Sequence, residues 1–290
     1  MSTYSIADLE KLSGIKSHTI RIWEKRYDLL IPKRTLTNIR CYDDEQLRKI
    51  LNVSLLIENG LKISKIAKLN SDEINKKIDG ISTSNLGYKS IINKLILDSL
   101  EFNESNFEEL ISELILKIGF SETYKNILIP LLNKLGVLWT IGDIYPANEH
   151  FLSNLINKKM YASIDSVNTD LSLNKKVLLF TPPWEDHNFC LLYAEYIFRK
   201  SGYSTINIGQ AISINSLRAC IKKINPDIIC TSLIVGHKEV KMQQFVDELW
   251  EIKRNSKILI GGNINLLKLI RTNANKYYDI ESFEQAIQIG

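Results

Sequence analysis

Residues 4–50 read YSIADLEKLSGIKSHTIRIWEKRYDLLIPKRTLTNIRCYDDEQLRKI and decide how the N-terminal part of the chain folds. Ser5 can cap a first helix that ends at Gly14, and Ser17 can cap a second helix. Pro32 then stops the helical pattern, and a polar, basic stretch follows it. Two short helices joined by a tight turn and followed by such a loop predict a winged helix-turn-helix.

The same stretch carries a local excess of positive charge. Between Lys11 and Tyr42, eight Lys or Arg residues are accompanied by only two acidic ones, an excess of six, whereas the whole chain has a formal net charge of +4. A basic patch in one short region is the usual footprint of phosphate contacts, although a solvated helix face would also explain the charge. The side chains that we expect to contact double-stranded DNA are Ser17, His18, Arg21, Lys25, Arg26, Lys33, Arg34 and Arg40.

This run resembles the DNA-binding domain of the MerR family of transcription regulators. The resemblance lies in TIRIWEKRYDLLIPKR (19–34) and in the pair Arg40 and Tyr42, so that more than ten positions agree at fixed spacing. Asn38 stands where the family commonly has Gly, and Asn tolerates the left-handed backbone of a wing turn. The resemblance implies a homo-oligomer, either a dimer or a tetramer, that binds a near-palindromic operator.

Two further segments follow. Residues 86–165 hold only amphipathic helical patterns, which predict a four-helix bundle. Between residues 174 and 290, helical stretches alternate with the β-rich runs KVLLF (176–180), STINI (204–208), DIICTSL (227–233) and KILIGG (257–262). This alternation predicts a Rossmann-like parallel sheet with flanking helices. The expected fold class is therefore multidomain, α and α/β, with the winged helix-turn-helix at residues 1–75.

The loop after the first predicted strand holds the clearest candidate for metal chemistry. In TPPWEDHNFC (181–190), Glu185 and His187 lie two residues apart at the carboxyl end of a strand, where ligands bind in such sheets. A neutral imidazole there can bind a metal, and the carboxylate can accept the other ring N–H. By itself, a His on a loop is more often a surface or capping residue.

The spacing around this loop resembles the pattern of cobalamin-binding domains, D-x-H-x-x-G, then S-x-L, then G-G. The corresponding residues are Glu185-x-His187-x-x-Cys190, Ser232-x-Ile234 and Gly261-Gly262. The resemblance implies that His187 is the lower axial ligand of cobalt and that Ser232 and the two glycines line the cleft for the cofactor's nucleotide tail. Cys190 stands where the family has Gly, and its side chain would narrow the route of that tail.

The bundle carries a second resemblance. In LWTIGDIYPANEH (138–150), nine residues separate Trp139 from the pair Glu149 and His150. This is similar to the W-x9-EH motif in the helical caps of light-responsive, cobalamin-dependent MerR-type regulators, the CarH/LitR-like group. The resemblance implies that Trp139 covers the upper face of the corrin and that Glu149 and His150 line the same space. Two separate motifs that imply one ligand favour cobalamin, as adenosylcobalamin or methylcobalamin.

We therefore expect a DNA-binding repressor that a cobalamin cofactor controls, with light as a candidate signal. The main alternative is a MerR-type regulator with a degenerate cobalamin domain that responds to another ligand or to a protein antagonist, and Cys190 favours this alternative. An enzyme such as a corrinoid carrier or a mutase subunit is disfavoured, because no substrate-binding barrel accompanies the motifs and the MerR-like head has no role there.

Composition narrows the other possibilities. The four cysteines are scattered without CxxC spacing, which disfavours a disulfide framework and a heavy-metal sensor. No run approaches the roughly 18 apolar residues of a membrane span. The start of the chain has no basic segment followed by an apolar core, so we expect a cytoplasmic protein.

Overall fold

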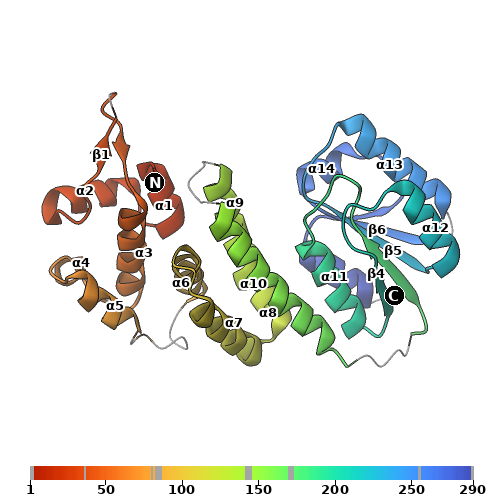
Figure 1. Cartoon of the computed structure of the whole chain (residues 1–290), viewed down its shortest axis with the longest axis horizontal. Coiled ribbons are helices and arrows are strands. Elements are labelled where there is room, and N and C mark those ends of the chain that lie inside the picture. Colours follow the sequence, from red (N-terminus) through yellow and green to blue (C-terminus); the bar gives the residue numbers. More distant parts are fainter. Residues whose placement is uncertain are drawn as a thin grey trace. The chain divides into compact units, whose positions relative to one another are not determined.

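The computed structural model describes residues 3–35, 37–79, 81, 87–140, 146–168, 173–253 and 256–288. The chain divides into two compact units, Met1–Ile156 and Asn157–Gly290. Figure 1 shows that the first unit is almost entirely helical and that the second has a sheet covered by helices. The predicted class, α followed by α/β, is confirmed. Among the described helices, none combines the length and the apolar character that a membrane crossing requires.

Residues 3–79, which we call the head, form a winged helix-turn-helix. Its elements are α1 (Ile6–Ser13), α2 (Ser17–Tyr27), β1 (Lys33–Arg34), β2 (Arg40–Cys41), α3 (Asp44–Glu58), α4 (Ile63–Ile66) and α5 (Ser71–Asp79). The predicted limits of the first helix are confirmed. Ser5 and Asp8 form a reciprocal capping box, and Gly14 ends the helix with a φ of 73°.

The predicted cap of the second helix is wrong. Its N-cap is Lys16, and Ser17 is the first residue of α2. The carboxylate of Glu10, on α1, does the capping instead, because it accepts the Ser17 N–H at 2.9 Å and the Ser17 hydroxyl at 2.6 Å. These bonds and the Lys16 ammonium lower the pKa of Glu10 to about 2. A carboxylate suits this position since the helix start is the positive end of its dipole.

The wing is a short antiparallel hairpin that stands out from the head (Figure 1). Lys33 pairs with Cys41, and Arg34 pairs with Arg40. Asn38 has a φ of 64°, so the expected left-handed backbone is confirmed. Its side-chain oxygen also accepts a hydrogen bond of 2.7 Å from Arg34 Nη1, which stabilises the turn.

The bundle follows. Its elements are α6 (Tyr88–Leu100), α7 (Glu104–Ile118), α8 (Phe120–Thr123), a π-helical turn (Tyr124–Leu128), α9 (Ile129–Thr140) and α10 (Pro146–Asp165). The third predicted helix, from residue 128 to 139, in fact begins at Phe120. The apolar stripe continues upstream, where Phe120 and Tyr124 are buried. The wide turn ends at Leu128, two residues before Pro130, which has no N–H to donate.

The second unit contains a parallel sheet with strand order β4-β3-β5-β6-β7. The strands are β3 (Lys176–Phe180), β4 (Ser204–Asn207), β5 (Ile228–Leu233), β6 (Lys257–Gly262) and β7 (Asn275–Tyr277), and the helices are α11 (Phe189–Lys200), α12 (Ile214–Ile224), α13 (Glu239–Ile252), α14 (Ile264–Leu269) and α15 (Ile280–Gln288). Four strands match the predicted runs. The sequence analysis missed β7, because a three-residue edge strand, Asn-Lys-Tyr, gives almost no apolar signal.

The two faces of this sheet differ in character. One face packs against α12 and α13 through a buried apolar cluster that includes Phe180, Leu233 and Ile260. Side chains alternate along a strand, so the intervening residues point to the other face. Cys230, Ser232 and Gly261 are therefore on that second face, away from the α12–α13 cluster.

A buried carboxyl group in the bundle gives a test of the packing. Asp98, on α6, is 4% exposed. Its Oδ2 has no hydrogen-bond partner in the part of the chain that the structure describes. Burial, which Lys94 and a hydrogen bond from Asn106 offset in part, raises the pKa of Asp98 to about 6.

Between an unfolded pKa of about 4 and this value, the folded state binds more protons than the unfolded state. The free energy of unfolding should therefore fall as the pH rises from about 4 to about 6, and Asp98→Asn should remove that fall. Urea unfolding at four pH values measures this, with Asp72→Asn, at an exposed position, as the control. An unchanged pH dependence in Asp98→Asn would contradict the assignment.

Candidate cofactor site and nucleic-acid interface

The loop after β3 holds a His–carboxylate pair at the carboxyl edge of the sheet. His187 Nδ1 lies 2.7 Å from Glu185 Oε1, and the side chains are 55% and 0% exposed respectively. The hydrogen bond at Nδ1 fixes the plane of the ring, so a metal would bind through Nε2. The structure thus brings the two predicted residues together, with the imidazole at the surface and the carboxylate beneath it.

Glu185 is held by backbone groups from a second loop. Its Oε2 accepts the N–H groups of Ile234 at 2.6 Å and Val235 at 2.7 Å, and its Oε1 accepts the N–H of His187 at 3.0 Å. Burial tends to raise the pKa of Glu185, but the bonds from the His187 ring and from these three N–H groups outweigh it, so the pKa lies below its usual value. Glu185 is therefore a carboxylate at neutral pH, and it orients His187 as a hydrogen-bond donor at Nδ1.

A single imidazole suits one kind of metal centre in particular. In the described ranges, no group of three or more His, Cys, Asp or Glu side chains could hold a metal ion. One imidazole can serve as a ligand of a metal whose other ligands come from a macrocycle.

Ser232 and Gly261 form a small cradle on neighbouring strands. They are register partners on β5 and β6. The Ser232 hydroxyl is buried, and no described residue is its hydrogen-bond partner. A Cβ placed on Gly261 would have no described atom within 4 Å. A buried hydroxyl beside open space is what a bound polar group would complete, so these residues fit the nucleotide tail of a cobalamin.

Gly262 has a different role from Gly261. Its φ is 125°, and a Cβ there would lie 2.2 Å from the carbonyl oxygen of Leu233. Gly262 is therefore required by the backbone of the neighbouring strand, whereas Gly261 is the glycine that leaves room above the sheet.

Cys190 borders the same face of the sheet. It is the second residue of α11, and it is close enough to the buried Cys230 to act on its pKa. Burial raises the pKa of Cys230 to about 12, and Cys190 adds to this rise. A thiol at this position adds a side chain where the Gly of the family pattern has none.

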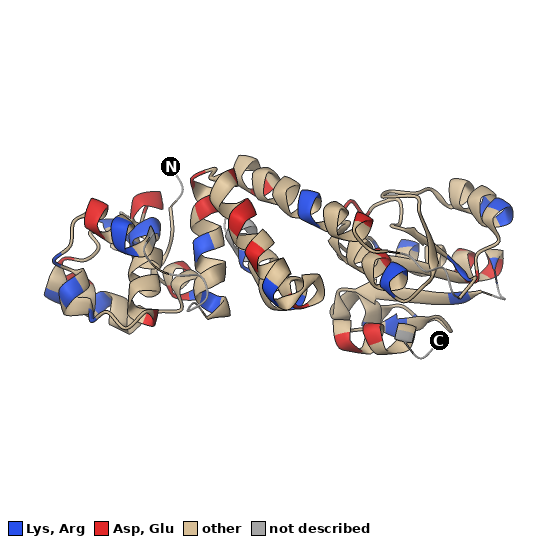
Figure 2. Ribbon diagram, turned by 90° about the horizontal axis from the view of Figure 1, so that it is seen from below, with Lys and Arg blue, Asp and Glu red and all other residues tan. Residues whose placement is uncertain are grey.

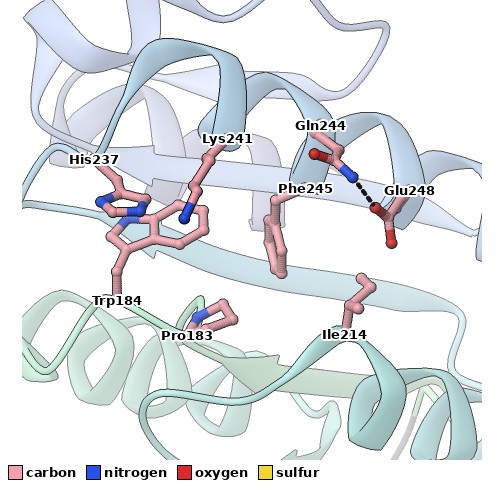
Figure 3. A pocket seen from close by; sticks show the side chains of 8 residues that line it. All are labelled: Pro183, Trp184, Ile214, His237, Lys241, Gln244, Phe245 and Glu248. Carbon is pink, nitrogen blue, oxygen red and sulfur yellow. Dashed lines mark hydrogen bonds between the residues drawn. The ribbon is translucent and has the colours of Figure 1, made fainter.

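The sequence analysis missed Trp184, which anchors the loop from the opposite face. Its ring stacks on His237 at a centroid distance of 5.4 Å and meets Phe245 edge-on at 5.4 Å. These rings line a cavity of about 380 Å³. Figure 3 shows the side chains around it, which are Pro183, Trp184, Ile214, His237, Lys241, Gln244, Phe245 and Glu248. The signal for this role was an indole directly before the buried Glu185, in a loop that is otherwise polar.

The three residues predicted to form the cap lie at the end of α9 and the start of α10. Glu149 accepts a hydrogen bond of 2.7 Å from Ser153 Oγ, and its Oε2 lies 3.4 Å from His150 Nε2. The structure therefore brings Glu149 and His150 together on the first turn of α10. Trp139 is the penultimate residue of α9, and its side chain lies outside the described residues.

The predicted DNA-contacting residues fall into two groups. His18, Arg21, Lys25 and Arg26 on α2, with Lys33 and Arg34 on the wing, are exposed. Ser17 and Arg40 are partly buried and are bonded within the head. Arg40 Nε donates to Glu24 Oε2 at 3.1 Å, and the Tyr42 hydroxyl donates to the same buried carboxylate. Arg40 thus fastens the wing to α2, in a head that carries both basic and acidic stretches (Figure 2).

Comparison with known families identifies two segments of the chain. Residues 4–73 match the family described as MerR HTH family regulatory protein, and residues 91–163 match the B12 binding domain. The chain therefore carries a MerR-type DNA-binding domain and a B12-binding domain, which is the domain content of a transcription regulator. This regulator is 22% identical over 271 residues to the HTH-type transcriptional repressor CarH of Myxococcus xanthus, covering 90% of this chain and 89% of that protein. It is 22% identical over 264 residues to the repressor CarA of the same organism, covering 90% and 86%.

A solved structure shares the fold of the regulator. The monomethylamine corrinoid protein of Methanosarcina barkeri superposes with a TM-score of 0.58 at 13% identity, covering 70% of this chain and 99% of that protein. At this identity the likeness shows the fold alone.

Substitutions of Gly261 and Gly262 should affect stability and cobalamin binding differently. Gly261→Ala should leave the free energy of unfolding within about 1 kcal/mol of the native value, because the methyl group meets no described atom, and it should weaken cobalamin binding by filling the cradle. Gly262→Ala should destabilise the sheet unit by more than that, since its Cβ collides with β5. Urea unfolding and titration with cobalamin measure the two effects. Equal stability losses in both variants would rule out the distinction.

The exposed basic residues of α2 and the wing predict how the affinity for operator DNA depends on salt concentration. Lys25→Ala should weaken binding to operator DNA and should reduce the slope of log affinity against log salt by about 1, because one phosphate contact is lost. Lys222→Ala, at an exposed position on α12, is the matched control. Fluorescence anisotropy at several salt concentrations gives the slopes, and identical slopes for Lys25→Ala and the native chain would remove Lys25 from the interface.

Proposed function

We propose that the regulator is a repressor whose operator binding is controlled by adenosylcobalamin held at His187, with light as the signal that ends repression. The observation that carries this proposal is the surface imidazole fixed by a buried, ionised carboxylate. The open cradle of Ser232 and Gly261 in the same unit supports it independently. The names of the two repressors that match about nine-tenths of the chain favour repression over activation.

Each residue has a defined task in this proposal. His187 would hold the cobalt through Nε2, and Glu185 would hold the ring of His187 and raise its basicity. Ser232 would donate a hydrogen bond to the nucleotide tail, and Gly261 would leave room for that tail. When bound, adenosylcobalamin supplies a cobalt–carbon bond that light can break. The protein binds and orients the cofactor, and it carries the result to the DNA-binding head.

The cap residues complete the proposed site. Trp139, Glu149 and His150 belong to the B12-binding domain, and we assign them to the upper face of the corrin. Binding of the cofactor favours one conformation of the chain, and thereby one homo-oligomer, a dimer or a tetramer, on DNA. Control requires that the cofactor bind the DNA-competent assembly more tightly than the other, by a coupling of about 1–3 kcal/mol.

Cys190 favours a second candidate function. Because Cys190 stands where the cobalamin-binding pattern has Gly, the same fold could respond to another ligand or to a protein antagonist. Operator binding that is equal with and without cobalamin, in the dark and in the light, would support this second function over the first.

The absorbance of bound cobalamin tests the first function. We expect the native chain to bind adenosylcobalamin in the dark and His187→Ala to lose at least tenfold in affinity. Glu185→Gln should lose about 10- to 100-fold, the usual effect of removing the partner of a ligating His. Asp186→Asn changes an exposed neighbour in the same loop and should bind normally.

A gel-shift experiment on the upstream DNA, dark and illuminated, adds the regulatory readout. The native chain with adenosylcobalamin should release DNA on illumination. A native chain that binds no corrinoid, or a His187→Ala variant that binds it equally well, would contradict the proposed site.

A further inference from the structure

A polar cluster joins the head to the bundle within the first unit. Lys134, on α9, donates hydrogen bonds of 3.0 Å to the carbonyl oxygen of Leu12 and 3.0 Å to Asn93 Oδ1. Leu12 lies in the last turn of α1, the first helix of the helix-turn-helix, whereas Asn93 is fully buried on α6. One ammonium group therefore connects two bundle helices to the DNA-binding head.

The position of this ammonium group is well matched to its partners. The last carbonyl groups of a helix have no partner inside the helix, and they form the negative end of its dipole. Burial and the charge of Lys89 lower the pKa of Lys134, while Glu58 acts in the opposite direction. A lysine is rarely buried unless it is paired, so a partly buried lysine here indicates a specific contact.

A second set of contacts surrounds the first. Glu58, the last residue of α3 in the head, pairs with Lys89 Nζ at 3.3 Å and accepts a hydrogen bond from Ser90 Oγ. The Lys89 side chain lies so close to Gly14 that a Cβ there would be 2.3 Å from Nζ. The end of α1 is thus enclosed by two lysines of the bundle.

Both ends of this connection lead to functional elements. On the head side, α1 carries Glu10, whose carboxylate accepts hydrogen bonds from Ser17 at the start of α2, the second helix of the helix-turn-helix and hence its recognition helix. On the bundle side, α9 continues from Lys134 to Trp139, five residues further along the same helix. A displacement of α9 that moved the ammonium off Leu12 would leave a carbonyl and the Asn93 amide oxygen without their partner.

We infer that Lys134 is a positioning residue that ties the orientation of the recognition helix to the position of α9. Its role in cofactor control rests on the proposed function, because that function makes α9 part of the cobalamin cap. The contact itself is a property of the first unit. The hydrogen bonds of Lys134 hold the head against α9 in the observed arrangement. A shift of α9 that separated Lys134 from Leu12 would break them.

Hydrogen exchange of the full chain tests the contact without any cofactor. In Lys134→Met, the backbone amides of residues 6–27 should exchange at least tenfold faster than in the native chain, and Lys134→Arg, which keeps the cation, should restore part of the protection. Lys117→Met, at an exposed position on α7, should have no effect. Unchanged exchange in Lys134→Met would overturn the inference, as would equal losses in the Lys117→Met control.

DNA affinity with and without adenosylcobalamin then tests the coupling. Lys134→Met should bind the cofactor as the native chain does, by absorbance, while the ratio of its two DNA affinities falls towards 1. A ratio equal to that of the native chain would overturn the coupling role. If the native chain itself gives a ratio of 1, the proposed function fails, and the exchange experiment still decides the role of Lys134.

Discussion

The loop that carries the candidate metal ligand depends on one buried carboxylate. Glu185 is fully enclosed, yet four hydrogen-bond donors keep it ionised: the ring of His187 and three backbone N–H groups. Two of those N–H groups belong to residues directly after β5, so the loop that carries the imidazole is locked to a second strand end. A buried charge is costly unless it is hydrogen-bonded, and here the same bonds that stabilise the charge also orient the ring. The hydrogen bonds to Glu185 therefore stabilise the fold of this loop and also fix the orientation of the imidazole.

The two faces of the sheet have different roles: one packs against helices, and the other carries the cradle. On the α12–α13 face, a continuous apolar cluster and the ring of Trp184 hold the loop from behind. On the other face, the Ser232 hydroxyl lies buried beside the open position above Gly261. An apolar core on one side and a cradle on the other suit a ligand-binding parallel sheet, because the strands must stay rigid while their ends receive the ligand.

Much of this could be predicted from the sequence. The runs that became β3 and β6 were located at their correct limits, because buried parallel strands are short, apolar and bounded by polar residues. Glu185 and His187 were paired on spacing alone, since two residues on one loop cannot lie far apart. Contacts between residues that are far apart in the sequence could not be predicted from these local patterns. Glu10 replaced Ser17 as the cap of α2, and Lys134 met the end of α1 from more than a hundred residues away, through packing that no local pattern records.

The central claim, that His187 supplies the lower ligand of a bound corrinoid, is tested most directly by electron paramagnetic resonance of the protein mixed with cob(II)alamin. The unpaired electron couples to the axial nitrogen, which splits each cobalt line into three for the common isotope and into two for nitrogen-15. Protein labelled with nitrogen-15 only in histidine should therefore change the triplets to doublets, and His187→Ala should abolish that change. Triplets that persist in the labelled protein would show that the nitrogen comes from the cofactor's own base, and would contradict the account.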